Sequence, residues 1–167
     1  WLPHNTHYLD ALSALTAAVP YDGSAPLITI SGVAGGGHYA GAVRPSVAIE
    51  DLDLALENLA LDGAPFASGA AVDAEGGHLL EVYAEDTGGR SSQKSVSFVI
   101  DLTSPVITAA GVAGGGYYEL PVSPEITAAD PHLSTFTATL NGEPFVSGGV
   151  IAAGGSYELA VSAYDKA

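Results

Sequence analysis

The sequence predicts an all-β protein: two tandem β-sandwich modules, the second lacking its last strand, preceded by a short N-terminal helix. A shift of 79 positions lays Pro26–Gly88 on Pro105–Ala167 without a gap, and 26 of the 63 aligned positions are identical. Apolar and polar residues alternate in short runs, the pattern of half-buried strands. Turn-forming residues separate these runs, as in a two-sheet sandwich. A repeat of this length indicates a small complete domain rather than a solenoid unit.

Residues 1–23 belong to neither copy and predict the helix. Leu9, Leu12 and Leu15 fall on one helical stripe, and Pro20 ends the run. A helix this short is marginal alone, so we expect the tail of a preceding domain or an interface helix, followed by a linker. Because the sequence starts at Trp1, we expect it to be part of a longer protein.

The first copy, residues 24–102, is predicted to have about seven strands. In the run HLLEVYAED, Leu80, Val82 and Ala84 alternate with Glu81, Tyr83 and Glu85. Hairpin turns are predicted at Asp62-Gly63 and, in the second copy, at Asn141-Gly142. The side chains expected to fill the two cores are Ile28, Leu61, Phe66, Val82 and Phe98, then Ile107, Leu140, Phe145 and Val161.

A glycine triplet occurs in both copies, in GVAGGGHY from Gly32 and GVAGGGYY from Gly111. Neither triplet is followed by a Lys-Ser/Thr pair or by a helical pattern, so a nucleotide-phosphate loop is not expected. We expect each triplet to connect the first two strands of its copy, where a positive φ or close packing excludes a side chain.

The second copy, residues 103–167, has no counterpart of the run SQKSVSFVID that ends the first. A sandwich without this strand has an apolar groove and an unpaired edge. Either the polypeptide continues, or another chain supplies the strand by β-augmentation and the protein is a polymerising subunit. In the second case the assembly edge consists of Tyr157, Leu159, Val161 and Ala163.

The net charge of the protein excludes some classes of binding partner. The net charge is −15 with only four Lys and Arg residues, so nucleic acid and anionic membrane surfaces would be repelled. No apolar run is long enough to insert into a membrane, and the absence of cysteine excludes disulfides. The expected partners are proteins, either neighbouring domains or identical subunits, with a glycan as the alternative.

The motifs TSPVIT, GVAGGGYY, DPHL, LNGEPF and YELAVSAYD resemble, in this order, the tandem bacterial immunoglobulin-like domains of extracellular and cell-surface proteins. The resemblance covers residues 24–167 and departs from the family's last turn at Gly88–Arg90. It implies an extracellular or cell-surface location and a non-catalytic spacer, stalk or adhesive role. Two alternatives stay open: a filament subunit assembled by strand complementation or helix docking, and an accessory region of a secreted hydrolase.

No catalytic residues are expected, because the sequence has no G-x-S-x-G elbow and nothing places a histidine beside a nucleophile. We also expect no cofactor, with calcium as the alternative, since calcium prefers oxygen ligands from loops. The calcium candidates are Asp51, Asp53 and Asp130. However, Asp53 becomes His132 in the second copy, and repeated Asp residues also lock turns through backbone N–H groups.

Aromatic residues suggest one further site. Tyr83 and Tyr164 fall near the same outward position of equivalent strands, and Tyr117 adjoins Tyr118. Aromatic rings beside acidic groups can hold a sugar, although most tyrosines in a sandwich fill core and rim positions. Tyr83, Tyr117 and Tyr164 are therefore the carbohydrate-binding candidates.

Overall fold

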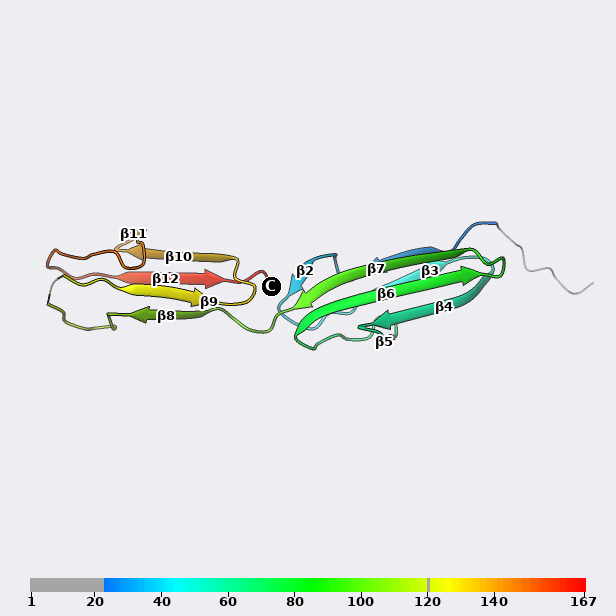
Figure 1. Cartoon of the computed structure of the whole chain (residues 1–167), viewed down its shortest axis with the longest axis horizontal. Helices are drawn as coiled ribbons and strands as arrows, with labels where there is room; N and C mark the ends of the chain where they lie inside the picture. The colour runs from blue at the N-terminus through cyan, green and yellow to red at the C-terminus, as the bar shows by residue number, and fades with distance from the viewer. Residues whose placement is uncertain (1–22, 120) are drawn as a thin grey trace, which may run out of the picture. The chain divides into compact units, whose positions relative to one another are not determined.

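The computed structural model describes residues 23–119 and 121–167, which form twelve β-strands and no helix (Figure 1). The helix predicted within residues 1–23 lies almost wholly on residues 1–22, outside the described part of the chain. No segment of the described part is a helix with the length and apolar character needed to cross a membrane. The all-β prediction is confirmed for these residues.

Seven strands belong to the first copy. They form a two-stranded sheet of β1 and β3 and a five-stranded sheet in the order β2-β7-β6-β4-β5. Their bounds are β1 Leu27–Ser31, β2 Gly37–Tyr39, β3 Ser46–Glu50, β4 Leu54–Leu61, β5 Ala64–Pro65, β6 Gly76–Asp86 and β7 Ser91–Ile100. The five-stranded order places the last strand beside the sixth and the sixth beside the fourth, with a short extra strand at the edge. This is the order of one sheet of an immunoglobulin-like sandwich.

Five strands belong to the second copy. They form a two-stranded sheet of β8 and β9 and a three-stranded sheet in the order β11-β10-β12. Their bounds are β8 Val106–Ala110, β9 Glu125–Ala129, β10 Thr135–Leu140, β11 Glu143–Pro144 and β12 Leu159–Tyr164. The pairing of β8 with β9 is antiparallel and so repeats the pairing of β1 with β3.

The chain forms two compact units. Unit 1 holds the described residues through Gly35 together with Arg44–Val72 and His78–Ser97. Unit 2 holds Gly36–Val43, Asp73–Gly77 and Phe98–Ala167.

The core of unit 1 shows that its sheets face each other. Leu80, Val82 and Ala84 of β6 form a buried cluster with Ile28 of β1. Half-buried apolar side chains from both sheets pack around this cluster: Ile30, Val47, Ile49, Leu59, Leu61, Phe66 and Val96. Alternation along β6 therefore buries one face of the strand, as the sequence predicted.

Both predicted hairpin turns are confirmed. Asp62 and Gly63 have φ values of 52° and 79°, and Asn141 and Gly142 have φ values of 52° and 85°. Two successive positive φ values define a type I′ turn, whose twist suits a two-residue hairpin. The first turn joins β4 to β5, and the second joins β10 to β11.

The glycine-rich connections follow β1 and β8, as predicted, and within the triplets Gly36 and Gly115 have positive φ values of 72° and 71°. Two glycines just before the triplets are more constrained. Gly32 has a φ of 83°, and a Cβ atom placed there would lie 2.5 Å from the backbone oxygen of Arg44. Gly111 has a φ of 80°, with the Ser123 oxygen 3.2 Å from such an atom. Close backbone approach and a positive φ together therefore require glycine at both positions.

The core prediction for the second copy is partly wrong. Ile107 was expected to be buried like Ile28, but it is 41% exposed whereas Ile28 is 6% exposed. Phe145 and Val161 are only half-buried. The physical reason is the lack of cover: within the described residues, β12 ends its sheet with no strand on its outer side, and every residue of β8 is exposed.

Candidate functional site

Unit 1 gathers three carboxylates from two connections. Asp51 and Asp53 lie between β3 and β4, and Asp86 ends β6. One carboxylate oxygen of each residue lies within 4.8 Å of the others. The Asp53 backbone N–H donates to Asp51 Oδ1 at 2.8 Å, and the Arg90 N–H donates to Asp86 Oδ1 at 2.8 Å. These bonds hold both connections in shape.

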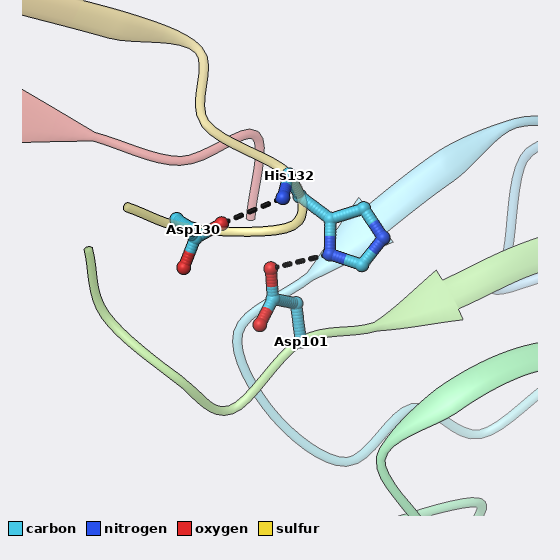
Figure 2. A group of neighbouring side chains, drawn as sticks. All are labelled: Asp101, Asp130 and His132. Atoms are coloured by element: carbon cyan, nitrogen blue, oxygen red, sulfur yellow. Dashed lines mark hydrogen bonds and ion pairs between the residues drawn. The ribbon is translucent and has the colours of Figure 1, made fainter. Parts of the chain in front are cut away.

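Unit 2 has a related group in which one member is a histidine. Figure 2 shows the ring of His132 directed at Asp101, with Nδ1 donating to Oδ2 at 2.9 Å. The backbone N–H of His132 donates to Asp130 Oδ1 at 2.7 Å. Thr103 donates to Asp101 Oδ1 through its backbone N–H and its hydroxyl. Asp101 is therefore a buried carboxylate with several donors.

These donors decide the charge of Asp101. Burial raises the pKa of its carboxyl, but the bonds from Thr103 and His132 act in the opposite direction and hold the pKa below its ordinary value of 3.8. The carboxylate therefore stays ionised at neutral pH. The group therefore contains a histidine that donates to a carboxylate, whereas the group of unit 1 consists of three carboxylates.

A second histidine–aspartate pair lies in unit 1. The Nδ1 of the buried His78 lies 2.7 Å from Asp62 Oδ2, and the Leu79 N–H donates to Asp62 Oδ1 at 2.8 Å. Burial raises the pKa of Asp62, but these two bonds and the charge of His78 lower it below 3.8 overall. Because Asp62 belongs to the β4–β5 turn, this pair fastens the hairpin to the start of β6.

The structure separates the three predicted calcium candidates. It brings Asp51 and Asp53 together in unit 1 and places Asp130 in unit 2. The sequence argument did not include Asp86 or Asp101 among the candidates. Asp86 was matched with Asp165 of the second copy but interpreted as a turn lock, and Asp101 could have been found because it occurs in the linker run VIDLTSP.

The turn-lock interpretation of the repeated aspartates is confirmed. Asp51 and Asp130 each accept the backbone N–H two residues ahead. Asp165 does the same with Ala167 at 3.0 Å, and Asp86 accepts the Arg90 N–H four residues ahead.

The carbohydrate candidates belong to two units: Tyr83 lies in unit 1, and Tyr117 and Tyr164 lie in unit 2. Tyr83 is half-buried on β6, and its hydroxyl donates to Glu85; this bond raises the pKa of Tyr83, while a bond with Ser91 acts against it. Tyr117 is exposed in the β8–β9 connection, and Tyr164 is exposed at the end of β12. That end of β12 and the connection from β8 to β9 lie at opposite ends of their strands (Figure 1). Sugar binding by these tyrosines stays a prediction.

The residues of the hypothesised assembly edge occupy β12 and the segment before it. Leu159, Val161 and Ala163 are half-buried on one face of β12. Tyr157 lies outside the strand, and its hydroxyl donates to the Ala153 carbonyl at 2.8 Å. An open groove of about 890 Å³ in unit 2 is lined by residues that include Ala109, Leu140 and Leu159.

Comparisons with known proteins are sparse. No family model and no curated protein matches the chain. A solved structure of fibronectin(III)-like modules of Clostridium thermocellum CbhA is similar, with 16% identity and a TM-score of 0.42, over 83% of this chain and 86% of that one. The assignment of an immunoglobulin-like sandwich rests instead on the strand order and on the facing sheets of unit 1.

Proposed function

We propose that the chain is a non-catalytic structural module of an extracellular bacterial protein, in which two sandwiches in series act as a spacer, stalk or adhesive support. The observation that carries this proposal is the duplication of the frame. Hydrogen bonds that fix turns and edges recur at positions 79 residues apart. These pairs are Phe66 N to Leu59 O and Phe145 N to Ala138 O, Gly69 N to Pro45 O and Gly148 N to Pro124 O, and Val47 N to Ser68 Oγ and Ile126 N to Ser147 Oγ.

The two copies differ at polar positions that a catalytic or binding site shared by both copies would have to keep. Asp53 has His132 at its equivalent position, and Asp62 has Asn141. The two copies therefore share the hydrogen bonds that stabilise the sandwich. A fold alone never fixes a function, so this argument rests on the repeated frame and on its differences.

Strand direction supports a mechanical role. The pairing of β2 with β7 is parallel, and joins Gly37 to Phe98, His38 to Val99 and Tyr39 to Ile100. When the two ends of the chain are pulled apart, parallel strands near opposite ends of a module slide along each other. All three residue pairs then resist together instead of opening one by one.

Single-molecule pulling on the full 167-residue chain tests the mechanical role. We expect two separate unfolding events, each releasing on the order of 20–28 nm of chain. A smooth extension without any force peak would contradict the proposal, because a spacer of this kind must resist extension.

The proposed extracellular location is tested by a separate experiment. An antibody raised against the chain should label intact cells of the source organism or its culture medium. Labelling seen only after the cells are permeabilised would overturn the extracellular assignment.

A filament subunit is the second candidate, and it is favoured by the edge of β12 that pairs with no strand within the described residues. Leu159 and Val161 of β12 itself are only half-buried, and an added strand could extend the sheet and cover them by β-augmentation. The accessory role in a secreted hydrolase also stays a proposal, without an observation of its own.

Sedimentation at rising protein concentration separates the spacer from the filament subunit. Self-association that is blocked by a free peptide with the sequence of β7, but not by a scrambled peptide, would support strand complementation. If the chain stays monomeric at every concentration, the filament-subunit role is excluded.

A further inference from the structure

A buried carboxylate oxygen in unit 1 has no hydrogen-bond partner. Asp53 is only 4% exposed. Its Oδ2 accepts the hydroxyl proton of Thr87 at 2.7 Å, whereas its Oδ1 is buried and accepts no hydrogen bond. An ionised oxygen removed from water without a partner is strongly unfavourable, so this atom calls for a positively charged ligand.

The neighbouring carboxylate is similarly placed. Asp86 is 1% exposed, and its Oδ2 accepts no hydrogen bond. The only cation beside it that the described residues provide is Arg90, whose Nη1 lies 3.7 Å from Oδ2, beyond hydrogen-bond distance. Arg90 is partly exposed, so its charge is screened by water.

Three carboxylates this close repel one another. One oxygen each from Asp51, Asp53 and Asp86 falls within 4.8 Å of the others, and one partly exposed guanidinium is not enough to balance them. A divalent cation bound among the oxygens would offset the repulsion and give Asp53 Oδ1 its missing partner.

Ligand type selects the cation. The group offers carboxylate oxygens only, with no histidine or cysteine, which favours a hard ion over zinc or copper. The ligands come from two connections, and calcium accepts such irregular oxygen sets with six to eight ligands, whereas magnesium demands a near-ideal octahedron. Water would complete the coordination.

The second copy provides a comparison within the same chain. Asp130, His132 and Asp165 occupy the positions of Asp51, Asp53 and Asp86. His132 there contributes an imidazole that bonds to Asp101, and no carboxylate oxygen of Asp101 or Asp130 is buried without a partner. Among these two groups, buried carboxylate oxygens that lack a partner therefore occur only in the group of unit 1.

We propose that Asp51, Asp53 and Asp86 bind one calcium ion, which ties the β3–β4 connection to the turn after β6. Because extracellular calcium modules bind with dissociation constants of about 10⁻⁴–10⁻³ M, the ion would be retained outside cells and released inside them. The site itself goes beyond the spacer function, but this expected affinity rests on the proposed extracellular location.

Calorimetry on the full chain tests the site. Titration of chelator-treated protein with calcium chloride should give a binding heat for one ion and a rise in melting temperature that saturates. Asp53→Asn should weaken calcium binding at least about tenfold, since it removes one of three charged ligands. Circular dichroism checks that this variant is folded, and Asp130→Asn is the matched control that should bind like the unmodified chain.

Four results would overturn the proposal. One is the absence of heat and of any melting shift at about 10 mM calcium, well above the expected range. Another is full binding by Asp53→Asn. A loss of binding in Asp130→Asn would move the ion to the second copy, and an equal response to magnesium would remove the calcium assignment.

Discussion

Strands β6 and β12 have matching inward-facing residues but different surroundings. Leu80, Val82 and Ala84 of β6 are fully buried, whereas their equivalents in β12 are half-buried. β6 has a neighbouring strand on each side, and β12 has one on only one side within the described residues. β6 also extends over eleven residues, and β12 over six. Burial of a strand is therefore determined by its neighbours as much as by its own sequence.

The largest effect is expected at the centre of unit 1. Leu80→Ala removes a fully buried side chain and should lower the free energy of unfolding by about 2–5 kcal/mol, through lost burial and the cavity left behind. Urea denaturation followed by circular dichroism, with hydrogen exchange of the β6 amides, measures this loss.

The equivalent change in the second copy sharpens the comparison. Leu159→Ala should cost about half as much, because part of the side chain is already in solvent. If Leu159→Ala and Leu80→Ala lower the free energy of unfolding equally, the two strands are equally covered. That result would contradict the difference in burial between β6 and β12.

Glycine replacement should have the next largest effect. Gly32→Ala forces an alanine to a positive φ and places its Cβ 2.5 Å from the Arg44 oxygen, so about 1–3 kcal/mol of stability should be lost. Gly111→Ala, with 3.2 Å to the Ser123 oxygen, should lose less in the same denaturation experiment. A larger loss for Gly111→Ala would contradict the two distances.

The smallest effect concerns pH. Because the pKa of Asp62 lies below 3.8 in the folded chain, its bonds contribute stability above that pH and lose it as the pH falls through the folded pKa. Asp62→Asn should cost about 0.5 kcal/mol or less at neutral pH, since the pair is partly exposed. Asn141 shows that an amide still accepts a backbone N–H at this position, from Glu158 just before β12 at 2.8 Å.

A series of melting temperatures from pH 6 to pH 2 checks this prediction. The acid-side fall in stability should be shallower for Asp62→Asn than for the unmodified chain. Identical slopes would mean that the His78 pair does not couple to folding.

Local rules predicted much of the fold. The alternation in HLLEVYAED predicted β6, and the Asp-Gly and Asn-Gly dipeptides predicted both hairpins, because each depends on neighbouring residues only. Ile107 was mispredicted because its burial depends on strands far away in the sequence. The repeat suggested equal cores, but it carries no information about which strands cover them.

The candidate site was predicted only in part. Asp51 and Asp53 stand two residues apart, so their proximity followed from the sequence. Asp86 joins them only through the packing of β6, and its equivalence to Asp165 suggested a turn lock. The partnerless oxygen of Asp53 is a property of three-dimensional burial that no spacing rule contains.

The Asn141-Gly142 turn has a consequence for the ageing of the protein. Glycine offers little steric hindrance to the attack of its own nitrogen on the preceding side-chain amide, so an exposed Asn-Gly pair is prone to deamidation. Loss of ammonia leaves a cyclic imide, which opens in part to aspartate, the residue that the first copy already has at position 62, and in larger part to isoaspartate, which lengthens the backbone by one carbon. Old molecules should therefore become more acidic on isoelectric focusing, and those that carry isoaspartate should also lose the geometry of this two-residue turn.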